Sequence, residues 1–149
     1  MIVIRVTGVP APKGSARAMN IGGRARLIAS SSGANARKQA AWVAAVRRAW
    51  SQERAVSLGS NAIRIDIEFI MPRPRGHYGT GRNEDKIKPS APDHPIAYPD
   101  VDKLIRCTLD ALSGFAFDDD SQIVHVNAKK RWSYPGAEPG AEIAVRAYP

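Results

Sequence analysis

The alternation of apolar and polar residues predicts strands at both ends of the chain and in its middle. In MIVIRVTGV, apolar side chains recur at every second residue from Ile2, which predicts an edge strand. In NAIRIDIEFIMP, apolar residues from Ile63 to Phe69 alternate with charged ones, and this is the clearest strand pattern in the chain. We expect two more strands, QIVHVNAKKRW and EIAVRAY, joined by a hairpin loop, YPGAEPG.

Two segments instead follow the period of an α-helix. The first is expected from about Ala34 to Arg54, with a hydroxyl of Ser31 or Ser32 as its N-cap. The second is expected to start at Pro99-Asp100 and to end at Ser113-Gly114, where glycine suits a left-handed residue. Residues at i, i+3 and i+4 spacing give each helix a core face. These faces are Trp42, Val43, Val46 and Trp50 in the first helix, and Val101, Leu104, Ile105, Thr108 and Leu112 in the second.

Two stretches have no such period. Residues 10–27 are rich in proline, glycine and basic residues, so we expect a basic loop that a partner orders, closed by a short strand at ARLIAS. Residues 73–98 form a long linker, either a flap over a site or a disordered insertion. The order of the elements predicts one α/β (α+β) domain, residues 1–149, in which a mixed sheet packs against two main helices.

Charge is distributed unevenly along the chain. The net charge is +8, and residues 1–57 carry ten Lys or Arg and a single acid. A basic surface of this kind attracts polyanions such as nucleic acid, although it also aids solubility. The single cysteine, Cys107, excludes a disulfide framework or a CxxC zinc site within one chain. Without an apolar run long enough for a signal peptide or a membrane span, we expect a cytoplasmic protein with no membrane partner.

Acidic residues gather where the rest of the chain is basic. Six of the 14 acids lie in YPDVDKLIRCTLDALSGFAFDDDSQIV, residues 98–124. Asp100 and Asp102 flank the predicted helix start, where the helix dipole favours negative charge by roughly 0.3–1 kcal/mol. Asp119 and Asp120 fit an acidic turn before a strand. Each of these readings explains one cluster, but neither explains why both clusters occur so close together.

A second reading brings the carboxylates together. We expect the segment FAFDDD to travel back along the helix and to set Asp120 beside Asp100 and Asp102. Carboxylates so close repel one another and persist as anions only with a cation among them. Oxygen ligands select Mg²⁺ or Mn²⁺, which can activate water and neutralise a phosphodiester. A basic surface around such a pocket is typical of a metal-dependent nuclease.

Two basic residues each allow two interpretations. Arg106 lies one turn after Asp102 and can form an ordinary i, i+4 ion pair with Asp102 or Asp110, or can stabilise a phosphate. Lys130 shares the parity of apolar residues in the last part of its strand, so it either reaches out to water or reaches into the site. Lys129 and Arg131 face the other way and fit phosphate contacts or solvated charges.

These residues resemble a known family. PDVDKLIRCTLDAL, followed by DDSQIV and a strand that ends in KRW, resembles the RusA family of Holliday-junction resolvases. The resemblance covers most of the chain except the linker at 73–98. It implies that Asp100, Asp102 and Asp120 bind Mg²⁺ and act in catalysis, with Mn²⁺ as a substitute, and that Asp119 is a neighbouring ligand of lesser importance. It also implies a homodimer that nicks a four-way DNA junction symmetrically.

The resemblance also bears on the basic residues. The family has an essential lysine at the position of Arg106, which therefore becomes a candidate catalytic residue, although arginine and lysine differ in reach and donor geometry. Lys130 matches a family lysine. The bases of the first helix are expected to help to hold the DNA backbone, together with Lys13, Arg17, Arg24, Arg26, Lys103, Lys129, Lys130 and Arg131. Two alternatives remain, a nuclease of relaxed specificity for flaps and forks, and an inactive DNA-binding module.

Overall fold

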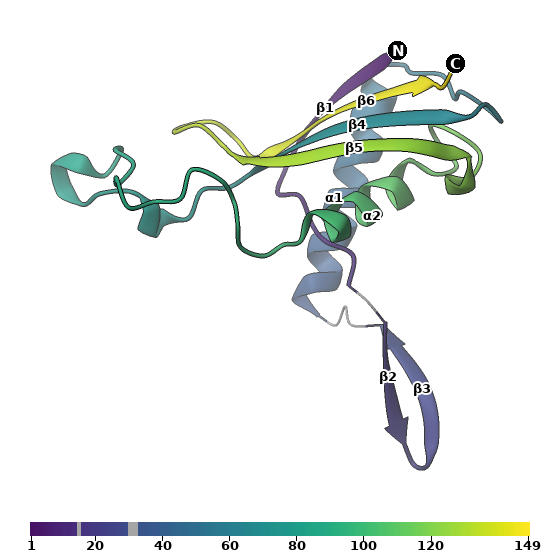
Figure 1. Ribbon diagram of the computed structural model, residues 1–149, viewed down its shortest axis with the longest axis horizontal. Coiled ribbons are helices and arrows are strands. Elements are labelled where there is room, and N and C mark those ends of the chain that lie inside the picture. The colour runs from purple at the N-terminus through teal and green to yellow at the C-terminus, as the bar shows by residue number, and fades with distance from the viewer. Residues whose placement is uncertain (15, 30–32) are drawn as a thin grey trace.

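The computed structural model describes residues 1–14, 16–29 and 33–149, and these form a single α+β domain. Its centre is a four-stranded sheet in the order β1-β6-β4-β5 (Figure 1). The strands are β1 (Ile2–Thr7), β4 (Ile63–Met71), β5 (Ile123–Trp132) and β6 (Gly140–Ala147). β6 pairs antiparallel with both β1 and β4, whereas β4 and β5 are parallel, so the sheet is mixed as predicted.

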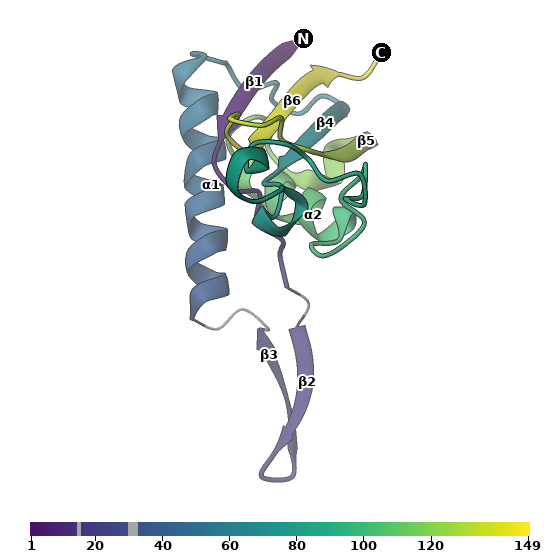
Figure 2. The same ribbon diagram turned by 90° about the vertical axis from the view of Figure 1, so that its left-hand side faces the viewer.

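Two helices cover one face of this sheet. They are α1 (Ala34–Gln52) and α2 (Val101–Leu112), and both lie close to the predicted bounds (Figures 1 and 2). The expected capping residues Ser31 and Ser32 lie outside the described residues. α2 ends as expected, because Gly114 adopts φ 77°, which favours glycine. Among the described residues, no helix is long and apolar enough to cross a membrane.

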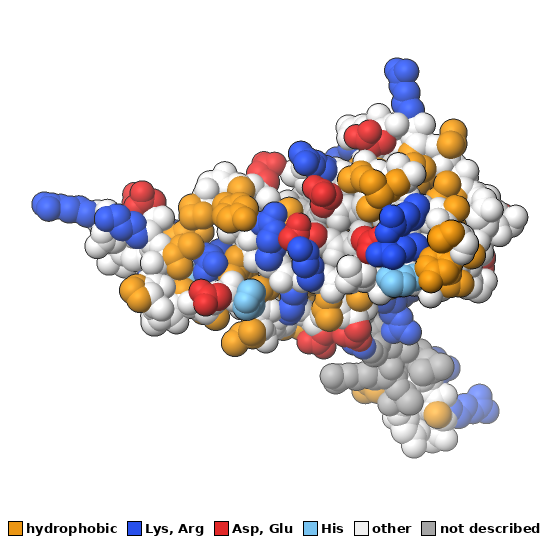
Figure 3. All heavy atoms as spheres, turned by 45° about the horizontal axis from the view of Figure 1, so that its top comes forward, with side chains coloured by type: hydrophobic (Ala, Val, Ile, Leu, Met, Phe, Trp, Pro, Cys, Tyr) orange, Lys and Arg blue, Asp and Glu red, His pale blue; other side chains and the backbone are white. Residues whose placement is uncertain are grey.

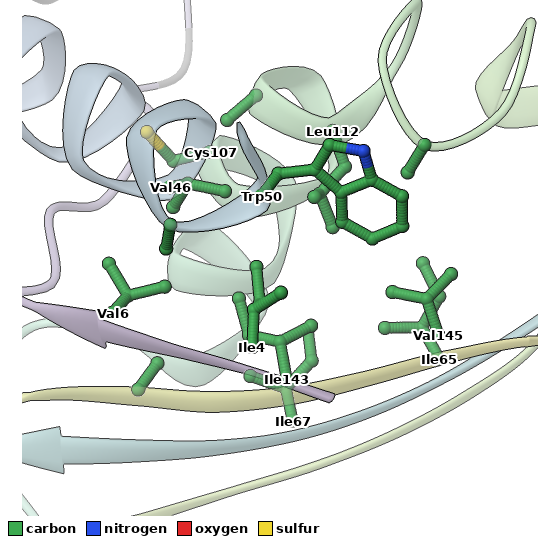
Figure 4. Close-up of a cluster of buried hydrophobic side chains, with 14 of the residues drawn as sticks. Ile4, Val6, Val46, Trp50, Ile65, Ile67, Cys107, Leu112, Ile143 and Val145 are labelled. Atoms are coloured by element: carbon green, nitrogen blue, oxygen red, sulfur yellow. The ribbon is translucent and has the colours of Figure 1, made fainter. Parts of the chain in front are cut away.

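The core lies between the sheet and the helices (Figure 4). The predicted faces are confirmed for Trp42, Val46 and Trp50 in α1, and for Leu104, Thr108 and Leu112 in α2. One buried polar contact joins the helices, because the indole N–H of Trp42 donates to Thr108 Oγ1 at 3.0 Å. Thr108 Oγ1 in turn donates to the Leu104 carbonyl at 3.0 Å. The helix pair is therefore fixed by a hydrogen bond as well as by apolar packing.

The predicted connection between the last two strands is wrong. β5 and β6 do not form a hairpin, because β6 lies between β1 and β4 and leaves β5 at the edge of the sheet. Gly140 allows β6 to lie next to β1, since a Cβ atom built there would meet the Val6 carbonyl oxygen at 2.0 Å. Strand patterns identify strands but not their order, which packing sets.

The predicted basic loop at residues 10–27 is also wrong in part. Residues 16–29 form a hairpin of two antiparallel strands, β2 (Ala16–Ile21) and β3 (Arg24–Ala29). The hairpin projects away from the domain (Figures 1 and 2). Its turn is Gly22-Gly23, with φ of 61° and 78°, and glycine pairs favour tight hairpin turns. The short strand expected at ARLIAS corresponds to β3, but the alternation of small and basic residues before it was too weak to predict β2.

The linker at 73–98 leaves the end of β4 and extends away from the domain before it returns to α2 (Figure 1). It contains two short 3₁₀ turns, η1 (Arg75–His77) and η2 (Gly81–Asn83), and an isolated bridge between Tyr78 and Ile87. Its last part returns along the domain, where the Trp132 indole donates to the Pro92 carbonyl at 3.0 Å. The linker therefore contains local turns of its own and contacts the end of β5.

Candidate functional site

The start of α2 places two carboxylates at the surface. Asp100 is the N-cap residue, with φ −68° and ψ 141°, and Asp102 lies in the first turn. The Asp100 side chain makes no capping hydrogen bond, so the helix does not use its oxygens. Asp102 forms an ion pair with the adjacent Lys103 at 3.2 Å, and its side chain is 68% exposed. Both carboxylates are thus accessible to a ligand from solvent.

Lys130 ties the end of β5 to the start of α2. Its Nζ donates to the carbonyl of Ala97 at 2.9 Å and to that of Pro99 at 2.8 Å. Pro99 directly precedes Asp100, so Lys130 fixes the backbone that carries this carboxylate. Lys130 was expected to reach either out to water or into the site. It is half-buried, and its side chain extends toward the backbone beside Asp100.

A wide groove of about 1340 Å³ opens beside Asp100. Its walls are residues 7–14, one face of α1, the chain around 95–100, and the ends of β4 and β5. The segment at 7–14 is held in place because Gln39 Nε2 donates to the Pro12 carbonyl at 2.8 Å and Lys13 N donates to the Lys103 carbonyl at 3.0 Å. The described lining contains one acid, Asp100, and five cations, namely Lys13, Lys38, Arg48, Lys103 and Lys130. Such a lining suits a polyanion that binds along the cations of the groove and reaches Asp100.

The sequence offers the bases of the first helix as contacts to the DNA backbone, but it does not single out Lys38 and Arg48, which line the groove. A signal was present. Ala41 and Ala45 lie between them on the same helix face, and all four residues line the groove. Small residues between two bases leave room for a phosphate backbone, which Lys and Arg side chains commonly contact.

Asp119 and Asp120 lie at a different place. They begin η3 (Asp120–Gln122), just before β5. Asp119 caps this turn, accepting from Ser121 N at 2.8 Å, and its own N–H donates to Gln122 Oε1 at 2.7 Å. The Ser121 hydrogen bonds lower the pKa of Asp119. The turn is fixed to the residues before β4, because Gln122 Nε2 donates to the Gly59 and Asn61 carbonyls, both at 2.8 Å.

The prediction that Asp120 would lie beside Asp100 and Asp102 is wrong for a single chain. The link after α2 does not travel back along the helix, because Gly114 N donates to the Phe117 carbonyl at 2.8 Å and closes a tight turn. β5 therefore starts near the C-terminal end of α2. The seven residue steps from Ile123 to Lys130 span roughly 23 Å at about 3.3 Å per residue. No three His, Cys, Asp or Glu side chains in the described parts of the chain lie close enough to hold a metal ion.

The ion pairs expected for Arg106 have other partners. Asp102 pairs with Lys103, and Asp110 pairs with Lys13. Arg106 itself is exposed, and its side chain makes no ion pair or hydrogen bond with the described residues. The structure thus leaves the guanidinium available one turn beyond the two carboxylates of the α2 start.

Lys129 and Arg131 lie on the open face of the sheet, away from the helices. Both pair with Glu68, at 3.2 Å and 3.0 Å. Burial would raise the pKa of Glu68, but the contacts with Lys129 and Arg131 outweigh it and lower the pKa. A neighbouring carboxylate, Asp66, pairs with Arg64 at 3.0 Å, and the Arg64 hydrogen bond lowers the pKa of Asp66. Blue and red side chains accordingly alternate over this face (Figure 3).

The remaining predicted DNA contacts lie on the hairpin. Arg24 and Arg26 are exposed on β3, and the backbone of Arg17 lies on β2, while its side chain is outside the described parts. The predicted contacts thus divide into three groups. Lys13, Lys103 and Lys130 line the groove, Arg17, Arg24 and Arg26 belong to the projecting hairpin, and Lys129 and Arg131 lie on the far face of the sheet.

A mixed sheet covered on one face by two helices, with two acids at the start of α2 and a basic groove beside them, defines an α+β domain suited to nucleic acid. The family model described as endodeoxyribonuclease RusA matches residues 7–146, nearly the whole chain. The chain therefore belongs to the RusA endodeoxyribonuclease family. It is also 27% identical over 96 residues to the uncharacterized protein YqaN of Bacillus subtilis (strain 168). That match covers 64% of this chain and 65% of the relative.

Proposed function

We propose that this protein is an endodeoxyribonuclease that resolves Holliday junctions in DNA recombination and repair by paired, symmetric nicks. Each nick would leave a 5′-phosphate and a 3′-hydroxyl. The observation that carries the proposal is the groove lined by five cations with Asp100 as its one described acid, in a chain of the RusA family. The cations would hold the phosphate backbone, and the acidic end would face the scissile bond.

The residues in and beside the groove would have different roles according to their positions. Lys38 and Arg48 on α1 and Lys13 on the opposite wall can contact phosphates along one strand. Such contacts position DNA but do not read its sequence, so junction shape would set most of the recognition. Lys130 is a positioning residue, because it holds the backbone that precedes Asp100. Arg106, exposed one turn after Asp102, would stabilise the charge of the phosphate, the role expected from the family lysine.

We further propose Mg²⁺ as the cofactor, with Mn²⁺ as a substitute. Such an ion supplies Lewis acidity and an activated water when it is bound. The exposed carboxylates of Asp100 and Asp102 are of the type these ions prefer. The resemblance implies that Asp119 and Asp120 join Asp100 and Asp102 around the ion. Among the described residues of one chain these four carboxylates do not come together, so a single protomer does not form that ligand set.

The experiment is cleavage of an end-labelled four-way junction, with linear duplex, flap and fork substrates of the same sequences as controls. Each substrate is incubated with Mg²⁺, with EDTA, and with the Asp102→Asn variant. Asp93→Asn serves as a matched control, because this exposed aspartate lies in the linker. We expect ligatable nicks on the junction that are lost in EDTA and in Asp102→Asn, and that persist in Asp93→Asn.

Other results would identify the alternatives. Equal cutting of flaps and forks would replace the resolvase with a general branched-DNA nuclease. Junction binding without cutting in any divalent metal would leave a DNA-binding module. Full activity of Asp102→Asn would show that the start of α2 is not the active site.

A further inference from the structure

Tyr98 is a large aromatic side chain that the domain leaves in solvent. It is 74% exposed, although it lies two residues before Asp100 and lines the basic groove. Among the described residues, its ring packs against no other ring and no guanidinium group, whereas the rings of Tyr134 and Tyr148 have such partners. A single exposed apolar residue is common on protein surfaces, but the surroundings of Tyr98 are not.

The backbone on both sides of Tyr98 is fixed by one lysine. Lys130 Nζ donates to the Ala97 carbonyl at 2.9 Å and to the Pro99 carbonyl at 2.8 Å, so it holds the residues immediately before and after the tyrosine. A tyrosine has only two χ angles, so its ring adds a large contact area at a low entropic cost. A ring presented from a fixed backbone therefore loses little freedom when a ligand binds to it.

The groove wall that contains Tyr98 is largely apolar. The linker and the strand ends contribute Met71, Pro95 and Trp132 to it, and the Trp132 indole N–H is already engaged by the Pro92 carbonyl at 3.0 Å. The groove cations on α1 belong to a different wall. The groove thus joins a basic wall to an apolar wall with an exposed aromatic ring. Proteins that bind unpaired nucleic acid strands combine these two features, because cations contact the backbone and aromatic rings stack on the bases.

The size and position of the groove suit a nucleotide. Its volume of about 1340 Å³ exceeds the roughly 300–1,000 Å³ of pockets that hold small organic ligands. The Cα atoms of Tyr98 and Asp100 are two residues apart, which is at most about 7 Å. A base on the Tyr98 ring and a phosphate of the same or the next nucleotide at Asp100 can therefore be bound together.

We propose that Tyr98 is a specificity residue, which stacks on a base exposed at a DNA branch point and so selects branched DNA over linear duplex. In a linear duplex each internal base is stacked between its neighbours and offers no free face. At a branch point the continuous stack is interrupted, and a base face becomes available. The proposal rests on the proposed function and adds a base contact to the phosphate contacts of the groove. Stacking tolerates any base, so this contact selects DNA shape rather than sequence.

The first test compares affinities for two DNA shapes. Binding of a labelled four-way junction and of a linear duplex is measured by fluorescence anisotropy in EDTA, for the wild type, Tyr98→Ala and Tyr98→Phe. Loss of one base–aromatic stack lowers affinity by about 5- to 150-fold. We expect Tyr98→Ala to lose this factor on the junction alone, with its affinity for duplex nearly unchanged. Tyr98→Phe keeps the ring and should bind both DNAs like the wild type.

Two controls address the fold and the choice of residue. Tyr148→Ala removes another exposed tyrosine, whose N–H donates to the Ala62 carbonyl just before β4, at the opposite end of β4 from the groove. Ile96→Ala truncates a side chain that is 83% exposed in the same segment as Tyr98 but does not line the groove. Both variants should bind the junction like the wild type. Circular dichroism and thermal unfolding should show Tyr98→Ala to be as folded as the wild type, because the removed ring is exposed.

Photo-cross-linking then identifies the stacked base. Single 5-iodouracil bases, which cross-link to aromatic side chains in contact with them, are placed at the branch point of the junction or in the middle of an arm. We expect the branch-point base to cross-link to Tyr98, as identified by mass spectrometry, and the mid-arm base not to do so. A branch-point base that cross-links only to other residues, or to none, would overturn the proposal.

The outcomes distinguish this proposal from the proposed function. If the wild type cuts the junction and Tyr98→Ala binds it equally well, the function stands and the role of Tyr98 is refuted. An equal loss of affinity for junction and duplex would make Tyr98 a general DNA contact, and a loss in Tyr98→Phe as large as in Tyr98→Ala would assign the effect to the hydroxyl group. Either result would overturn the stacking proposal. A wild type that neither binds nor cuts the junction would refute both.

Discussion

The hydrogen bond between Trp42 and Thr108 holds the two helices that frame the groove, and Thr108→Val removes it. Valine has nearly the shape of threonine, so packing is kept while the Trp42 indole N–H loses its buried acceptor at 3.0 Å. An orphaned buried donor costs about 1–3 kcal/mol. For a domain of this length, each kcal/mol lowers the melting temperature by roughly 2–4 °C. We therefore expect a fall of about 2–12 °C in a thermal unfolding scan.

Two further variants show whether the hydrogen bond is the cause. Thr108→Ser keeps the hydroxyl that accepts from Trp42, so its loss should come only from the missing methyl group. In a Trp42→Phe background there is no indole N–H to orphan, and Thr108→Val should cost much less than in the wild type. A Thr108→Val protein that melts at or above the wild-type temperature would refute this reasoning. So would an equal cost of the substitution in both backgrounds.

Four other variants or conditions follow from the structure. Lys130→Met should slow junction cleavage about tenfold or more, because a charge-assisted hydrogen bond is worth about 1.5–3 kcal/mol. Lys129→Met, on the far face of the sheet, should cleave at nearly the wild-type rate, and equal effects of the two variants would contradict the positioning role of Lys130. The double variant Lys38→Ala with Arg48→Ala should reduce the steepness of log DNA affinity against log salt concentration by about 0.9 per lost phosphate contact. Arg5→Ala, on the open face of the sheet, should leave this steepness unchanged. Burial and the nearby Asp110 raise the pKa of Cys107 to about 11. Iodoacetamide at pH 8 should therefore leave the Cys107 thiol of the folded protein unmodified and should alkylate it in urea, and rapid alkylation without urea would contradict this. Asp66 and Glu68 have lowered pKa values, so the stability they contribute is present above the ordinary carboxyl pKa of about 4 and is lost as the pH falls through the lowered values. The double variant Asp66→Asn with Glu68→Gln should therefore lose less melting temperature than the wild type between about pH 5 and 3, and an equal loss in both proteins would contradict this.

The sequence predicted the elements that local patterns determine. The alternation from Ile63 to Phe69 and the stripe from Leu104 to Leu112 are dictated by burial on one face, and both elements appear where expected. The order of the strands was not predicted, because β6 crosses to a place between β1 and β4, and the same alternation would fit a hairpin with β5. The Gly22-Gly23 turn was the available signal for the β2–β3 hairpin, but the residues around it are largely alanine and arginine, and alanine is a weak strand former.

The candidate site was predicted in its residues but not in its arrangement. Asp100 and Asp102 were placed at the helix start from local rules, and the structure confirms that position. The approach of Asp120 depended on the direction of the chain after α2, and there Gly114 and Phe117 form a tight turn instead of an extended return. The basic groove as a whole was not predicted, because Lys38 and Arg48 meet Lys13 only through the packing of α1 against the N-terminal segment.

The most direct test of the proposed activity uses a supercoiled plasmid that extrudes a cruciform, incubated with the wild-type protein and Mg²⁺. A junction resolvase places two nicks on opposed strands of the cruciform base, so we expect linear plasmid whose ends map to that base. Asp102→Asn should leave the plasmid supercoiled. Linear product that arises equally from a plasmid without the cruciform, or no cutting of either plasmid by the wild type, would contradict the assignment of this fold and groove to junction resolution.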